Sequence, residues 1–130
     1  METLDSASLR PILLVDDEQQ LLDATSARIA RALPEVEILA FTDGESALSD
    51  TADRALGLAI LDIDLPGMNG MQVAEALRKR SVELPILFLT GTSKDALADA
   101  YEQVGAVGWI QKPAVGQTLI DAITAHALGE

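Results

Sequence analysis

The sequence has 130 residues, of which 48% are hydrophobic and only 3% aromatic, which suits one domain with an aliphatic core. It contains no cysteine, which excludes disulfides, thiolate metal sites and thiol catalysis. Its 21 acidic and 9 basic residues give a formal charge of −12, which opposes direct binding to nucleic acid and anionic membranes. The longest dense apolar stretch, Leu84–Leu89, is too short to span a bilayer, and the start lacks the features of a secretory signal, so we expect a cytoplasmic protein.

Five short apolar runs along the chain predict β-strands. Three of them are apolar at nearly every position, which is typical of strands buried on both faces of a parallel sheet. The runs are Pro11–Val15, Val36–Phe41, Leu58–Leu61, Pro85–Leu89 and Gly108–Ile110.

Segments with helical features follow each run. Thr42 with Glu45, and Asn69 with Gln72, resemble capping boxes before the second and third helices, and Gly105 is suited to close the fourth. The apolar residues at helical spacing are Leu22, Ile29, Leu33, Val73, Leu77, Leu97, Tyr101, Val104, Leu119, Ile120, Ile123 and Ala127. This alternation predicts an α/β fold with helices on both faces of a parallel sheet. We expect residues 1–10 to be a flexible lead-in and residues 11–130 to form one domain.

Polar residues follow four of the apolar runs at the point where each run ends. Asp16 and Asp17 follow the first run, Asp62 the third, Thr90 the fourth, and Lys112 comes two residues after the fifth. Because ligands bind at the carboxyl ends of parallel strands, we expect these side chains to gather at one edge of the sheet.

Three carboxylates at one edge predict a cation. Two unit charges about 4 Å apart repel by roughly 4 kcal/mol at an effective dielectric of about 20. Oxygen ligands with open positions suit Mg²⁺. A lysine and a hydroxyl beside such an ion favour the handling of a phosphoryl group, with Asp62 as the nucleophile.

Each of these residues also has a purely structural interpretation. Asp16 and Asp17 can cap the first helix, Asp62 can belong to a turn, Thr90 can cap the next loop, and Lys112 can lie on the surface. All of these interpretations would have to hold together at the ends of four strands, and so the functional interpretation is favoured.

Four motifs resemble the response-regulator receiver domain of two-component signalling. They cover nearly the whole chain, in the order and at the separations typical of that family. The motifs are VDDE at Val15–Glu18, LDIDLPGMNG at Leu61–Gly70, FLTG at Phe88–Gly91 and GAVGWIQKP at Gly105–Pro113. The resemblance implies a doubly wound, flavodoxin-like five-stranded parallel sheet of order 2-1-3-4-5 with five flanking helices, so that residues 11–130 are the receiver domain.

The resemblance also assigns a role to each acid. Asp62 would be the phosphorylation site. Asp17 and Asp62 would ligate Mg²⁺ through their side chains and Asp64 through its backbone carbonyl, while Asp16 would help to orient the metal. The acidic side chain of Asp64 is an extra feature, and we hypothesise that it modulates metal affinity or the lifetime of the acyl phosphate.

In the family, a threonine and an aromatic residue form a conformational switch. Thr90 would meet a phosphoryl oxygen and Lys112 would pair with the phosphoryl group. Trp109 stands where the family more often has Tyr or Phe, and it would either rotate inward or simply pack at the sheet edge. The donor would be a sensor histidine kinase or a phosphotransfer protein. The output face for a downstream protein or domain would be the fourth helix, fifth strand and fifth helix, and the resemblance also allows a phosphorylation-linked homodimer.

Two other functions remain as alternatives. Asp62-Ile63-Asp64 after a strand also resembles the signature of haloacid-dehalogenase-type phosphatases, although their paired acids come in the opposite order along the chain. The second alternative is a receiver-like binding module that signals without phosphate. Such variants usually lose an acid or the lysine, whereas this sequence retains them.

Overall fold

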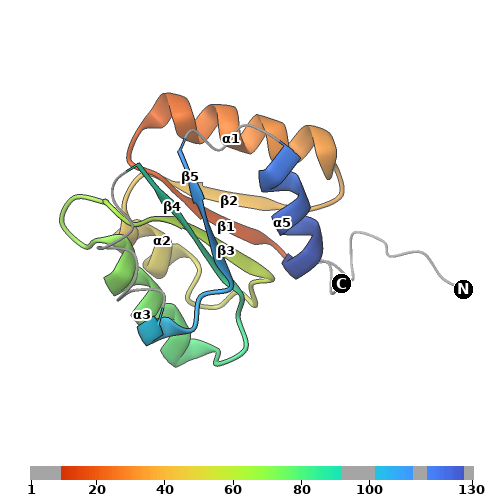
Figure 1. Cartoon of the computed structure of the whole chain (residues 1–130). Coiled ribbons are helices and arrows are strands. Elements are labelled where there is room, and N and C mark those ends of the chain that lie inside the picture. Colours follow the sequence, from red (N-terminus) through yellow and green to blue (C-terminus); the bar gives the residue numbers. More distant parts are fainter. Residues whose placement is uncertain (1–9, 92–101, 113–116, 128–130) are drawn as a thin grey trace, which may run out of the picture.

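A computed structural model describes residues 10–91, 102–112 and 117–127, which form one α/β layer structure (Figure 1). The elements are β1 (Ile12–Val15), α1 (Gln19–Ala32), β2 (Ile38–Phe41), α2 (Gly44–Asp50), β3 (Leu58–Asp62), α3 (Gly70–Arg80), β4 (Ile86–Thr90), β5 (Gly108–Gln111) and α5 (Gln117–Ala127). Most of the predicted fourth helix, including Leu97 and Tyr101, lies outside the described residues. The chain is helical at 102–104, and Gly105 follows with φ 63, as expected of a glycine that ends a helix.

The five strands form a single sheet in the order β2-β1-β3-β4-β5, and every pairing is parallel. The predicted flavodoxin-like order is therefore confirmed. The order reverses beside β1, since β1 pairs with β2 on one side and with β3 on the other. That reversal places the carboxyl ends of β1 and β3 next to each other, at the topological switch point where such folds bind ligands.

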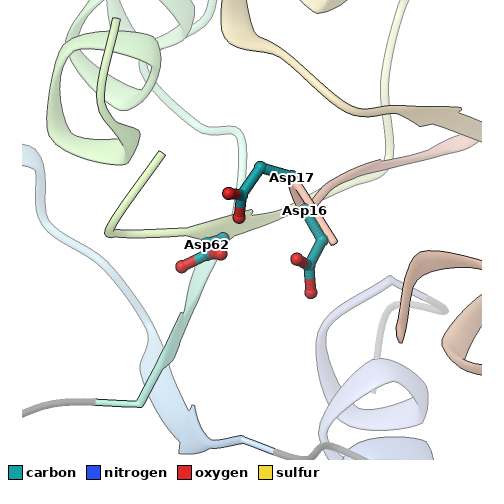
Figure 2. A group of neighbouring side chains, drawn as sticks. All are labelled: Asp16, Asp17 and Asp62. Atoms are coloured by element: carbon teal, nitrogen blue, oxygen red, sulfur yellow. The ribbon is translucent and has the colours of Figure 1, made fainter. Parts of the chain in front are cut away.

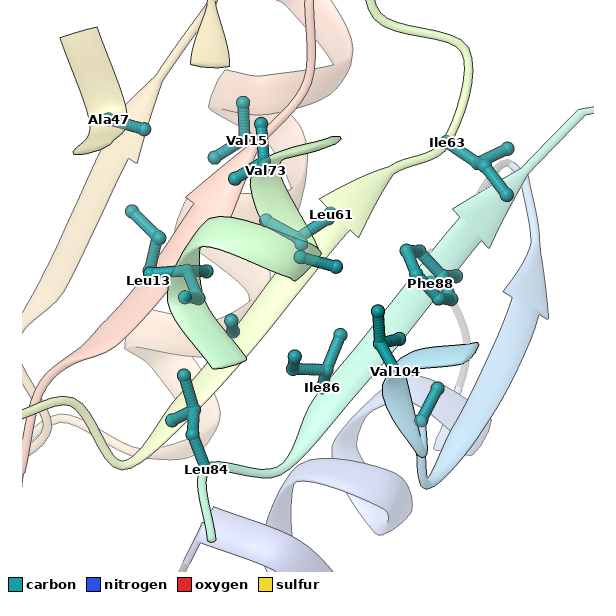
Figure 3. Close-up of a cluster of buried hydrophobic side chains, with 14 of the residues drawn as sticks. Leu13, Val15, Ala47, Leu61, Ile63, Val73, Leu84, Ile86, Phe88 and Val104 are labelled. Atoms are coloured by element: carbon teal, nitrogen blue, oxygen red, sulfur yellow. The ribbon is translucent and has the colours of Figure 1, made fainter. Parts of the chain in front are cut away.

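The core has two layers, one on each face of the sheet. Side chains alternate between faces along a strand, so Leu13 and Val15 of β1 join one cluster while Ile12 and Leu14 join the other. Figure 3 shows the first cluster, which α2 and α3 cover, and α1 and α5 supply the second. Every residue of β1, β3 and β4 is buried, which explains why these runs are apolar almost throughout.

The caps of two helices test the sequence predictions separately. The capping box at α3 is confirmed, because the side chains of Asn69 and Gln72 each accept a hydrogen bond from the other residue's backbone N–H. The capping box predicted at Thr42 is wrong. Asp43 is the N-cap of α2, and its carboxylate accepts a hydrogen bond from Ser46 N at 2.7 Å. Asp43 lies one residue closer to the first turn and offers a stronger acceptor than a threonine hydroxyl.

Within residues 10–91, 102–112 and 117–127, no helix has both the length and the apolar character needed to cross a bilayer.

Candidate functional site

The ends of β1 and β3 bring three carboxylates together (Figure 2). Asp16 and Asp17 follow β1, and Asp62 is the last residue of β3. One carboxylate oxygen from each lies within 4.8 Å of the other two. Asp16 and Asp62 are each only 2% exposed, whereas Asp17 opens to solvent. The sequence prediction that these three acids meet at one edge is confirmed.

Lys112, which follows the edge strand β5, contacts this cluster. Its ammonium lies 2.9 Å from Asp62 Oδ2, 3.4 Å from Asp16 Oδ1 and 3.2 Å from Glu18 Oε1. Its backbone N–H donates to the carbonyl of Thr90 at 2.8 Å. This hydrogen bond holds the Lys112 backbone at the end of β4. One cation therefore serves three carboxylates, and the side chain is only 13% exposed.

Two backbone hydrogen bonds fix the orientation of the buried carboxylates. Asp16 Oδ1 accepts from the N–H of Glu18, and Asp62 Oδ1 accepts from the N–H of Asp64, each at 3.0 Å. These are Asx-type turns, in which the side chain accepts from the residue two positions on. No side chain caps α1, whose N-cap residue is Glu18. The alternative role of Asp16 and Asp17 as caps of that helix is therefore wrong.

The charges in the cluster perturb one another. Burial raises the pKa of Asp16 above its ordinary 3.8, against the opposing effect of the Glu18 N–H and the Lys112 charge. Desolvation, together with a hydrogen bond to Asp62 and its charge, raises the pKa of Asp17. Burial alone would lower the pKa of Lys112, but its hydrogen bond and ion pair with Asp62 raise it above the ordinary value. Lys112 therefore holds its proton more firmly than an ordinary lysine, and Asp16 and Asp17 ionise less readily than ordinary aspartates.

The other residues predicted for the site lie at its border. Thr90 ends β4 and is 1% exposed, directly after Leu89, the β4 residue that pairs with Asp62. Asp64 is exposed, and its carboxylate is not part of the cluster of three. Trp109 pairs in register with Phe88 and is 37% exposed.

Two residues that the sequence reasoning did not assign also shape the site. Glu18 contacts Lys112, and the only signal for it was its position directly after the paired acids. Gly70 begins α3 against the end of β3. A Cβ on Gly70 would lie 2.3 Å from the carbonyl oxygen of Asp62 and 2.6 Å from Ile63 Cα. Only glycine permits this close approach, which holds the start of α3 beside Asp62.

The donor set fits a hard divalent cation. All the acidic groups offer oxygen only, and Lys112 is the one basic side chain that contacts them within the described residues. Even with Lys112 bound, the three aspartates carry an excess of negative charge in a largely buried position. Mg²⁺ binds through one or two carboxylates and retains waters, which matches a cluster with one member open to solvent.

Comparison with known proteins assigns the chain to a family. The sequence model of the response regulator receiver domain matches residues 12–124. The chain belongs to this family. Its relatives include the response regulator protein FleR of Pseudomonas aeruginosa, 35% identical over 92% of this chain and 25% of FleR. The photosynthetic apparatus regulatory protein RegA of Rhodobacter capsulatus is 34% identical over 95% of this chain and 66% of RegA.

Solved structures agree with the assignment. The chemotaxis response regulator CheY4 of Vibrio cholerae superimposes with a TM-score of 0.82 at 28% identity, over 91% of this chain and 98% of CheY4. The receiver domain of NtrX from Brucella abortus gives a TM-score of 0.80 at 29% identity, over 92% of this chain and 99% of that domain. The chain spans 25% of the length of FleR and 66% of the length of RegA. Family membership argues against the haloacid-dehalogenase-type alternative.

Proposed function

We propose that this receiver domain accepts a phosphoryl group on the carboxylate of Asp62 in a reaction that depends on Mg²⁺. The observation that carries the proposal is the environment of Asp62. Its carboxylate is buried, lies 2.9 Å from the ammonium of Lys112, and shares a cluster with Asp16 and Asp17. A buried aspartate beside a cation and a metal-binding group is the arrangement that acyl-phosphate formation requires.

Four aspartates would hold and orient the metal. Asp17 and Asp62 would bind Mg²⁺ through their carboxylates, Asp64 through its backbone carbonyl, and Asp16 would orient it. The Asp64 carboxylate is not part of the three-acid cluster, which leaves its carbonyl as the group proposed to bind. When bound, Mg²⁺ would offset negative charge on the acids and on the incoming phosphoryl group.

In the chemical step, one oxygen of Asp62 attacks the phosphorus of a phosphohistidine. The P–N bond breaks, its electron pair remains on the imidazole nitrogen, and that ring takes up a proton from water. Asp62 Oδ2 now accepts a hydrogen bond from Lys112, so the ammonium already lies beside the carboxylate that would carry the phosphoryl group. Thr90 would donate its hydroxyl to another of those oxygens. Water later hydrolyses the acyl phosphate and restores the carboxylate.

Partners follow from this reaction. The donor would be a sensor histidine kinase or phosphotransfer protein in the cytoplasm. The predicted fourth helix, β5 and α5 would form the output face, with Thr90 and Trp109 as the switch. Trp109 is partly exposed on β5 in this structure, so phosphorylation would have to turn it toward the core if it follows the family's switch. The same face would serve a downstream domain, a partner protein or a phosphorylation-linked homodimer.

Fluorescence of Trp109, the chain's single tryptophan, tests the proposal. Mg²⁺ is added first, and then beryllofluoride, which imitates a phosphoryl group on a carboxylate. A saturable change is expected in the wild type and in Asp50→Asn, which alters an exposed aspartate outside the site. Asp62→Asn should abolish the beryllofluoride response. A response that survives in Asp62→Asn would refute the proposal, and no response together with no phosphoryl adduct would favour a phosphate-independent binding module.

A further inference from the structure

A cavity lies at the opposite ends of the strands from the acidic cluster. It has a volume of about 440 Å³. Its walls are Arg10 before β1, the segment 52–56 before β3, and the loop between α3 and β4. These segments precede strands, whereas the acids follow them, so the length of the sheet separates the two sites. The volume falls within the range of small-molecule pockets, which is about 300–1,000 Å³.

The charge of this cavity is opposite to that of the molecule. Three of the chain's nine basic residues line it, namely Arg10, Arg54 and Arg80, and Asp53 is the single acid among its lining residues. The whole chain carries a formal charge of −12. A local concentration of arginine on so acidic a protein would attract anions that the rest of the surface repels.

The arginines are held in different ways. Arg80 donates to the carbonyl of Leu48 and to the carbonyl and hydroxyl of Thr51, the last two at 3.3 Å and 3.1 Å. These acceptors are neutral, so they fix the guanidinium without neutralising it. Arg54 pairs with Glu37 at 2.7 Å on the exposed surface. Within the described part of the chain, neither Arg10 nor Arg80 forms an ion pair with a carboxylate.

The cavity also has apolar lining residues. These are Ala52, Ala55, Leu56 and Leu84, of which Leu84 is only 5% exposed. A ligand that fills this cavity would therefore combine an anionic group with an organic body that covers apolar surface. Arginine guanidinium groups match phosphate oxygens with paired N–H donors.

We propose that this cavity binds a small phosphorylated metabolite. Its phosphate would lie between Arg10 and Arg80, and its organic body would cover Leu56 and Leu84. Asp53 offers an acceptor for a hydroxyl of that body. Inorganic phosphate alone would leave these two leucines uncovered and should bind more weakly. This site is separate from the Asp62 reaction, and either can fail without the other.

Amide NMR spectra of the whole chain, in EDTA and low salt, test the proposal with adenosine monophosphate as the probe. Saturable shifts are expected in segments 52–56 and 80–84, with weaker binding of inorganic phosphate and of adenosine. Arg10→Gln should weaken binding by about tenfold or more, since a hydrogen bond to a charged group is lost. Arg31→Gln removes an equal charge from the end of α1, outside the cavity, and should leave affinity unchanged.

Three results would overturn the proposal. These are the absence of saturable shifts in the two segments, an affinity that Arg10→Gln leaves unchanged, and inorganic phosphate binding as tightly as the nucleotide. The Arg10 side chain makes no hydrogen bond or ion pair with the described residues, so Arg10→Gln should leave the fold intact. It is therefore the decisive variant. Arg80→Gln, which also loses the contacts to α2, should weaken binding further in a sample shown by urea denaturation to be folded.

Discussion

Gly70→Ala should destabilise the domain and disturb the acidic site together. The added Cβ would lie 2.3 Å from the carbonyl oxygen of Asp62, 2.6 Å from Ile63 Cα and 2.9 Å from the carbonyl carbon of Asp62. All three atoms belong to the backbone, so no side-chain rotation relieves the contact. The start of α3 or the end of β3 must move by roughly 1 Å to reach an ordinary separation.

Overpacking of this kind typically costs about 1–3 kcal/mol. Alanine's higher helix propensity offsets less than about 1 kcal/mol of it. We therefore expect urea denaturation to show a free energy of unfolding lower by about 1–3 kcal/mol for Gly70→Ala. The displacement includes the backbone of Asp62, so Mg²⁺ should also bind more weakly, as measured by calorimetry.

Gly91→Ala is the matched control, because a Cβ on Gly91 would meet nothing within 4 Å. Its unfolding free energy should stay within about 0.5 kcal/mol of the wild type. If the two variants were equally stable, or if Gly70→Ala retained wild-type Mg²⁺ affinity, the close approach of α3 to β3 would not position Asp62.

Three further predictions concern the charges of the cluster. Lys112→Met leaves the buried Asp16 and Asp62 without their shared cation, so urea denaturation in EDTA should show a loss of about 3 kcal/mol, and an unchanged value would contradict the ion-pair geometry. Because burial raises the pKa of Asp16, its contribution to stability is fully present below its ordinary pKa of 3.8 and is lost as pH rises through the folded value. In EDTA, Asp16→Asn should therefore become more stable than the wild type as pH rises above 3.8. Melting temperatures of the two proteins that change in parallel with pH would count against this. Mg²⁺ at about 100 times its Kd should stabilise the wild type by about 2.7 kcal/mol, with a smaller gain in Asp17→Asn, and equal gains would exclude Asp17 as a ligand.

The sheet was predictable because strands buried on both faces appear in the sequence as continuous apolar runs. Central strands such as β1 and β3 are apolar at every interior position, so their runs match the observed strands to within a residue. Their polar termini were predictable for the same reason. Parallel strands end at one edge, and any acid there must meet its neighbours, as Asp17 and Asp62 do.

The features that the sequence did not predict depend on contacts between distant segments or on a choice between similar neighbours. Thr42 and Asp43 are adjacent and both suit an N-cap, so the pattern alone chose the wrong one. The contact of Glu18 with Lys112 spans 94 positions in the chain. The approach of Gly70 to the backbone of Asp62 depends on the angle at which α3 meets β3, which no local pattern encodes.

The arginines of the cavity come from three separate segments, none of which forms a recognisable motif. Arg10, Arg54 and Arg80 meet only because β1, β3 and β4 are neighbours in the sheet and begin at the same edge. A basic cluster assembled in this way is invisible in the sequence of a chain whose formal charge is −12.

The location of the phosphoryl group tests the central claim most directly. The protein is incubated with Mg²⁺ and acetyl phosphate, any acyl phosphate is reduced with borohydride, and the modified peptide is identified by mass spectrometry. The account predicts one modified residue, Asp62, with no modification in EDTA or in Asp62→Asn. Modification at another aspartate, or at Asp62 to the same extent without Mg²⁺, would contradict it.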